Sequence, residues 1–73
     1  MTTAIKFSTR EVEVIKLLAL NLSFYDISDR LGISARTAQS YAESARKKLG
    51  VKYARQLPQA YQDATGDNPW PAS

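Results

Sequence analysis

The chain has 73 residues with a net charge of +3, and it contains neither cysteine nor histidine. This length allows one small domain. The missing residue types exclude disulfides, metal sites built on thiolate or imidazole ligands, and catalysis by Cys or His. We therefore expect no metal, no cofactor and no enzyme activity. No apolar run approaches the roughly 20 residues of a membrane span and the N-terminus lacks a signal peptide, so we expect a cytoplasmic protein without membrane contact.

The N-terminal part of the chain predicts one helix after a short disordered segment, residues 1–6. Ser8, followed three residues later by Glu11, forms a capping box, which indicates a helix over residues 8–21. Phe7 can pack on Val12, and Asn21 tolerates the left-handed backbone that ends a helix. Apolar residues at helical spacing define its expected buried face: Val12, Ile15, Leu18, Ala19 and Leu22.

Two further helices follow with the same kind of start. Ser23 and Asp26 predict a short helix over residues 23–31 that ends at Gly32, and Ser34 caps a third helix over residues 34–49 that ends at Gly50. So few residues separate these two helices that they must cross at a steep angle. A tight turn of this kind, containing glycine, is typical of a helix-turn-helix.

The third helix divides into two faces at about 100° per residue. Its apolar stripe consists of Ala38, Tyr41, Ala42, Ala45 and Leu49, and its polar face of Arg36, Gln39, Ser40, Glu43, Arg46 and Lys47. The polar face suits a polyanion, although a helix that contacts only water would show the same pattern. At the third helical position the first two helices carry an acid and this one carries Thr37, and a carboxylate there would repel a phosphate.

The positive charge is concentrated in residues 34–55, whereas residues 1–33 carry as many acids as bases. In the basic segment a single acid, Glu43, stands against Arg36, Arg46, Lys47, Lys48, Lys52 and Arg55. A one-sided basic patch is the charge distribution expected of a nucleic-acid-binding protein.

The C-terminal part predicts a basic, irregular stretch up to Gln56 and a fourth helix over residues 58–64 with Pro58 as its first residue. Residues 65–73 contain glycine and prolines that cannot continue the helix, and we expect a disordered tail. The chain is therefore predicted to be all-α, a small bundle of three to four helices over residues 7–64 with a helix-turn-helix.

The sequence resembles the LuxR/GerE-type helix-turn-helix family of bacterial regulators, in its stand-alone GerE-like form. The resemblance lies, in register, in residues 7–15, 22–34, 36–37 and 48–51. A small phage protein would have the same shape. The resemblance implies a four-helix domain whose third helix enters the major groove and whose fourth commonly pairs two subunits. It also implies base contacts by Gln39, Ser40 and Glu43. It implies phosphate contacts by Arg36, Thr37 and Lys47, and we expect Tyr41 and Arg46 to contribute to the same contacts.

The chemistry of these side chains agrees with such contacts, because Gln can bond adenine through two hydrogen bonds and Glu can accept from cytosine. The chain departs from the family pattern at Ala38, Gln39 and Tyr41, and the region around Pro58 leaves the usual dimer helix in doubt.

Two hypotheses follow. The first is a sequence-specific, double-stranded DNA-binding transcription regulator, acting alone or as a homodimer. The alternative is a protein-interaction adaptor or anti-activator on the same fold, binding another transcription regulator or RNA polymerase. Its partner surface would use Phe24, Tyr25, Tyr61 and Trp70.

Overall fold

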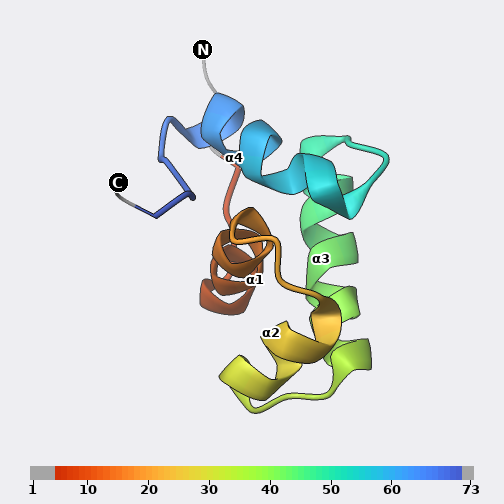
Figure 1. The fold of residues 1–73 in the computed structure, drawn as a ribbon. Coiled ribbons are helices and arrows are strands. Elements are labelled where there is room, and N and C mark those ends of the chain that lie inside the picture. Colours follow the sequence, from red (N-terminus) through yellow and green to blue (C-terminus); the bar gives the residue numbers. More distant parts are fainter. Residues whose placement is uncertain (1–4, 72–73) are drawn as a thin grey trace.

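The computed structural model describes residues 5–71 and shows a small helical bundle (Figure 1). The elements of this part of the chain are α1 (Thr9–Ala19), α2 (Phe24–Leu31), α3 (Ala35–Leu49), the 3₁₀ helix η1 (Ala54–Gln56) and α4 (Leu57–Thr65). The predicted all-α class is confirmed. The predicted disorder of residues 1–4 and 72–73 lies outside the described residues, and Ile5 and Lys6 are exposed and not helical.

Each of the first three helices begins after a serine cap, as predicted. Ser8 Oγ accepts from the Glu11 N–H at 3.1 Å, and Glu11 Oε1 accepts from the Ser8 N–H at 2.7 Å, which completes the capping box. Ser23 and Ser34 accept in the same way from the N–H groups three residues later. These bonds satisfy backbone donors that the first helical turn would leave without a partner.

The turn between α2 and α3 has a left-handed residue at its start. Gly32 has φ +67°, and its N–H donates to the Ser28 carbonyl, as does the N–H of Ile33 at 3.0 Å. Gly50 ends α3 in the same conformation. Asn21 is also left-handed, with φ +64°, but α1 already ends at Ala19, two residues earlier than predicted.

The core lies where α3 packs on α1 and α2, with α4 closing it against α1 and α3 (Figure 1). The largest fully buried side chains are Ile15, Ile27, Leu57 and Val14. The inner face of α3 contributes small residues instead, namely Ala38, Ala42 and Ala45, so this helix can lie close to its neighbours. Val14 lies outside the buried face that we predicted for the first helix, whose members Val12, Leu18 and Leu22 are only partly buried.

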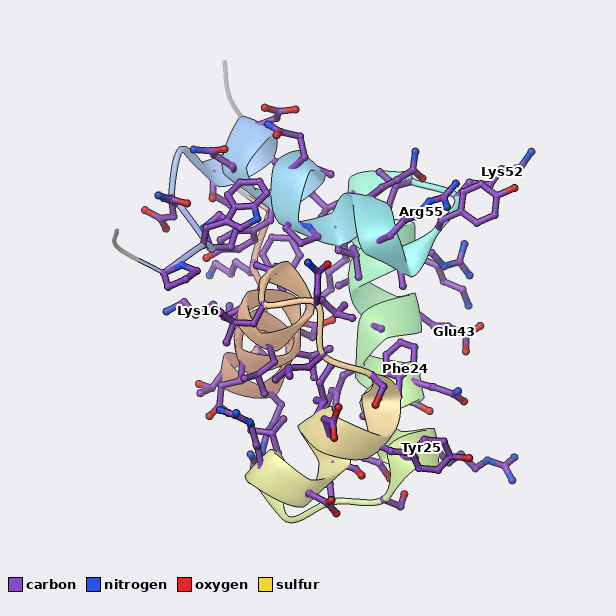
Figure 2. The ribbon with its side chains drawn as sticks, viewed as in Figure 1. Lys16, Phe24, Tyr25, Glu43, Lys52 and Arg55 are labelled. Carbon is purple, nitrogen blue, oxygen red and sulfur yellow. The ribbon has the colours of Figure 1, made fainter. Side chains whose placement is uncertain are left out.

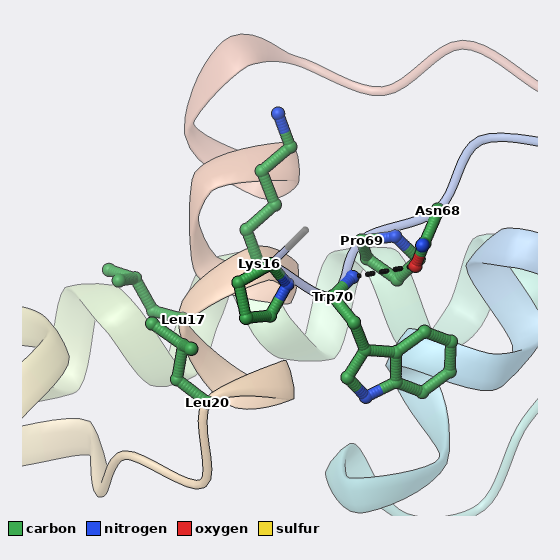
Figure 3. Close-up of a pocket in the computed structure, with 7 residues that line it drawn as sticks. Lys16, Leu17, Leu20, Asn68, Pro69 and Trp70 are labelled. Atoms are coloured by element: carbon green, nitrogen blue, oxygen red, sulfur yellow. Dashed lines mark hydrogen bonds between the residues drawn. The ribbon is translucent and has the colours of Figure 1, made fainter. Parts of the chain in front are cut away.

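The C-terminal part differs most from expectation. A 3₁₀ turn occupies residues 54–56, where an irregular stretch was expected, and Pro58 is the second residue of α4 rather than the first. The tail was predicted to be disordered over residues 65–73, but Thr65 is helical and the described part folds back on α1. Pro69 is buried there, and Trp70 is partly buried (Figure 3).

The tail docks because α1 offers it an apolar surface. Residues 68–71 line a pocket together with Lys16, Leu17 and Leu20 of α1 (Figure 3). A turn fixes the path of the chain, since the Trp70 N–H donates to Asn68 Oδ1 at 2.9 Å. Within residues 5–71, every helix is too short and too polar to span a bilayer.

Candidate nucleic-acid interface

The outer face of α3 projects away from the core. Its exposed residues are Arg36, Gln39, Ser40, Glu43 and Lys47. The three buried alanines lie on the opposite face, so packing holds the helix by one side and leaves the other free. All three residues that we predicted to contact bases are therefore open to solvent on one surface, and Figure 2 shows Glu43 pointing outward from it.

The N-terminus of α3 suits an anion better than the starts of α1 and α2 do. Its first turn holds no acid, whereas α1 has Glu11 and α2 has Asp26 in this turn. Ser34 Oγ donates to Thr37 Oγ1 at 2.8 Å and accepts from the Thr37 N–H. When Thr37 Oγ1 accepts in that bond, its own hydrogen can be donated to a phosphate oxygen.

Tyr41 is half-buried, and its ring packs against the core. It therefore belongs to the apolar stripe, and only its hydroxyl group can serve the phosphate contact that we expected of this residue.

Arg46 is engaged within the protein. Its Nη1 donates to the carbonyl oxygens of Val51 at 3.4 Å and Lys52 at 3.3 Å, and its Nη2 lies 3.7 Å from Glu43 Oε1. The guanidinium group therefore ties the segment after α3 to the helix and faces the Glu43 carboxylate. The helical pattern placed Arg46 on the polar face, but it contained no sign that loop carbonyls would fold back onto this residue.

Residues 51–56 form a hydrogen-bonded loop beside this surface, which we call the α3–α4 loop. Gln56 Oε1 accepts from the N–H groups of Lys52 at 3.1 Å and Tyr53 at 2.9 Å. Lys52, Tyr53 and Arg55 are exposed, and the Arg55 guanidinium lies 5.1 Å from the centre of the Tyr53 ring. From the sequence we placed Lys52 and Arg55 in the basic segment, but we predicted no role for either residue.

A shallow groove connects the loop with the outer face of α3. It is lined by Phe24, Gln39, Ala42, Glu43, Arg46, Lys52, Tyr53 and Ala54. In Figure 2 the side chains of Glu43, Lys52 and Arg55 point to the same side of the molecule, and Lys16 points to the other. The candidate interface thus extends beyond the helix.

Lys48 lies apart from this interface although it belongs to the basic segment. Its Nζ contacts Glu11 Oε1 at 2.7 Å and the Lys6 carbonyl at 2.9 Å, and it lies 5.6 Å from the centre of the Phe7 ring. Glu11 is only 2% exposed. Burial by itself would raise the pKa of this carboxyl group, but the hydrogen bonds from Lys48 and Ser8, the nearby Ser44 hydroxyl and the charge of Lys48 lower that pKa from 4.5 to about 2.

The four residues predicted as a partner surface do not lie together. Phe24 is half-buried in the groove and Tyr25 is 76% exposed. Trp70 is partly buried in the tail, where it lines a pocket beside α1 (Figure 3). For Tyr61 the prediction was wrong, because this side chain is 6% exposed and its ring meets Phe7 edge-on with centroids 5.3 Å apart.

Residues 6–60 match the family described as bacterial regulatory proteins, luxR family (GerE). No curated protein and no solved structure matches the chain. The matched range contains α1, α2 and α3 and the start of α4, and the family consists of helix-turn-helix regulators that bind double-stranded DNA. The chain belongs to the luxR family of bacterial regulatory proteins.

Proposed function

We propose that the chain is a sequence-specific, double-stranded DNA-binding transcription regulator that inserts α3 into the major groove. One observation carries this proposal: α3 buries only alanines and exposes a continuous row of hydrogen-bonding side chains. A helix held in this way has its outer half free to enter a groove about 12 Å wide.

In this proposal base readout is the task of three exposed side chains. Gln39 can make two hydrogen bonds to adenine, and Ser40 can donate or accept. The Glu43 carboxylate can accept from the amino group of cytosine, and the nearby Arg46 reduces the repulsion between that carboxylate and the phosphates. These residues set the target sequence.

Phosphate contacts position the helix without reading the bases. We assign them to Arg36, Thr37 and Lys47, with the Tyr41 hydroxyl as a further donor. Arg36 and Lys47 are exposed near opposite ends of α3, so they can reach different phosphates. We propose for Arg46 a different task, holding the α3–α4 loop, because its donors already face two carbonyl groups of that loop.

A single module of this size makes few contacts, so useful specificity calls for two copies on adjacent half-sites. We therefore propose that the regulator acts as a pair on DNA.

The test is selection from a pool of randomised duplexes by the purified protein, with affinities measured at several salt concentrations. We expect one enriched motif. Gln39→Ala should cost about 1–3 kcal/mol on the selected site and relax the preference at one base pair. Lys47→Ala should weaken binding equally on all sequences and reduce the salt slope by about 1. A pool that yields no motif after repeated rounds would contradict sequence-specific readout.

A further inference from the structure

We propose that the α3–α4 loop is a second DNA contact, which grips the phosphate backbone beside the major groove through Lys52 and Arg55. This inference rests on the proposed function and extends it to residues outside the recognition helix. It gives the basic residues that follow α3 a task that is independent of base sequence.

The loop has the right position. Gln39 and Glu43 of α3 line one groove with Lys52 and Tyr53, so the loop borders the proposed base-reading surface directly. The fifteen residues of α3 span about 22 Å at 1.5 Å per residue, and its C-terminal end, where the loop begins, lies about 9 Å beyond Glu43. When the middle of this helix faces the bases, the end that carries the loop reaches the sugar–phosphate backbone.

The loop is also held in shape before any ligand arrives. Arg46 donates to the carbonyls of Val51 and Lys52, and Gln56 accepts from the N–H groups of Lys52 and Tyr53. These four bonds fix both sides of the Lys52 peptide backbone. A segment that is already ordered loses less conformational entropy on binding, which favours affinity.

The charges of the loop suit a phosphate. The C-terminus of a helix carries partial negative charge, which would repel the DNA backbone unless cations cover it. Arg46 lies over the carbonyls that follow α3, and Lys52 and Arg55 are exposed and form no ion pair within residues 5–71. Arg55 lies against the exposed Tyr53 ring, which restrains its side chain (Figure 2).

The experiment measures the salt dependence of binding to a labelled duplex of mixed sequence by fluorescence anisotropy, from about 0.05 to 0.3 M salt. No operator is needed, because phosphate contacts do not depend on base sequence. The test variant is Lys52→Gln/Arg55→Gln. The matched control is Lys16→Gln/Arg30→Gln, which removes the same charge from α1 and α2 at a groove lined by Lys16, Leu17, Arg30 and Leu31.

We expect the test variant to lower the slope of log affinity against log salt by about 1.8, and to weaken binding about 60-fold at 0.1 M salt. The control should keep the slope of the unaltered protein. Equal slopes for the test variant and the unaltered protein would overturn the loop contact and leave DNA binding itself in place. An equal loss in the control would overturn it too, by showing that only net charge matters. If the unaltered protein does not bind the duplex at any salt concentration, this result would contradict both the proposed function and the loop contact.

Discussion

At the scale of the residue, the Glu11 carboxylate joins two distant parts of the chain. Its Oε1 accepts from Ser8 at the start of α1 and from Lys48 in the last turn of α3, and its Oε2 is buried with no hydrogen-bond partner within residues 5–71. The capping box predicted the first of these bonds, because it depends on residues three positions apart. The bond to Lys48 spans 37 positions and depends on how the helices pack, so no local pattern could indicate it.

The lowered pKa of Glu11 makes the stability of the fold sensitive to acid. A carboxyl group whose pKa is lower in the folded state stabilises the protein above its unfolded pKa, and this contribution is lost as the pH falls toward its folded pKa. For a shift from 4.5 to about 2, we expect the free energy of unfolding to fall by about 2 kcal/mol between pH 6 and pH 3 on account of this group. Urea denaturation at a series of pH values, followed by circular dichroism, measures it.

Glu11→Gln should flatten this acid dependence relative to the unaltered protein. Glu13→Gln serves as the control, because Glu13 lies on the same helix with its side chain 42% exposed and forms its ion pair with Arg10. We expect this control to keep the full loss of stability in acid. If Glu11→Gln showed the same loss between pH 6 and pH 3, another group would be responsible.

At the scale of the element, α3 is defined by small residues on one side and polar residues on the other. Its start, its end and its two faces could be predicted from the sequence, because caps, left-handed glycines and helical periodicity depend on residues close together in the chain. The roles of its charged residues could be predicted only in part. Arg46 donates a hydrogen bond to the carbonyl of Lys52 in the loop, and Lys48 donates one to the carboxylate of Glu11 in α1.

Enlarging the buried face of α3 should displace the helix. Ala38→Leu places a branched side chain where the native residue is fully buried, and we expect a loss of about 1–3 kcal/mol in unfolding free energy because the core must move to admit it. Ser40→Leu adds a side chain of the same size on the exposed face and should change stability by less than about 0.5 kcal/mol. Thermal denaturation of both variants makes the comparison, and equal melting temperatures would show that α3 is not closely packed.

At the scale of the whole molecule, the fold class followed from the sequence but the arrangement of its C-terminal part did not. Tyr61 belongs to the core and the tail docks on α1, whereas both were expected at the surface. Whether a Tyr or a Trp is buried depends on which surfaces other elements leave uncovered. Phe7 provides the contact for Tyr61, and Leu17 and Leu20 provide the surface for the tail.

The docked tail can be followed through Trp70, which is the one tryptophan of the chain. We expect its fluorescence to shift on urea denaturation with the same midpoint as the helical signal, because the partly buried indole lies beside the folded helices. Removing the side chain in Trp70→Ala should lower the unfolding free energy by about 1–2 kcal/mol. An emission spectrum of the native protein identical to that of the denatured chain would show that the tail is not docked.

The alanine face of α3 has a consequence for how this protein can change over generations. Fold stability depends on Ala38, Ala42 and Ala45, and the proposed choice of target depends on Gln39, Ser40 and Glu43, which alternate with them along the same helix. Since the outer residues are exposed and contribute little to the core, substitutions there cost little stability. Such a helix allows the preferred operator to drift, or to be redesigned in the laboratory, while the scaffold that presents it stays the same.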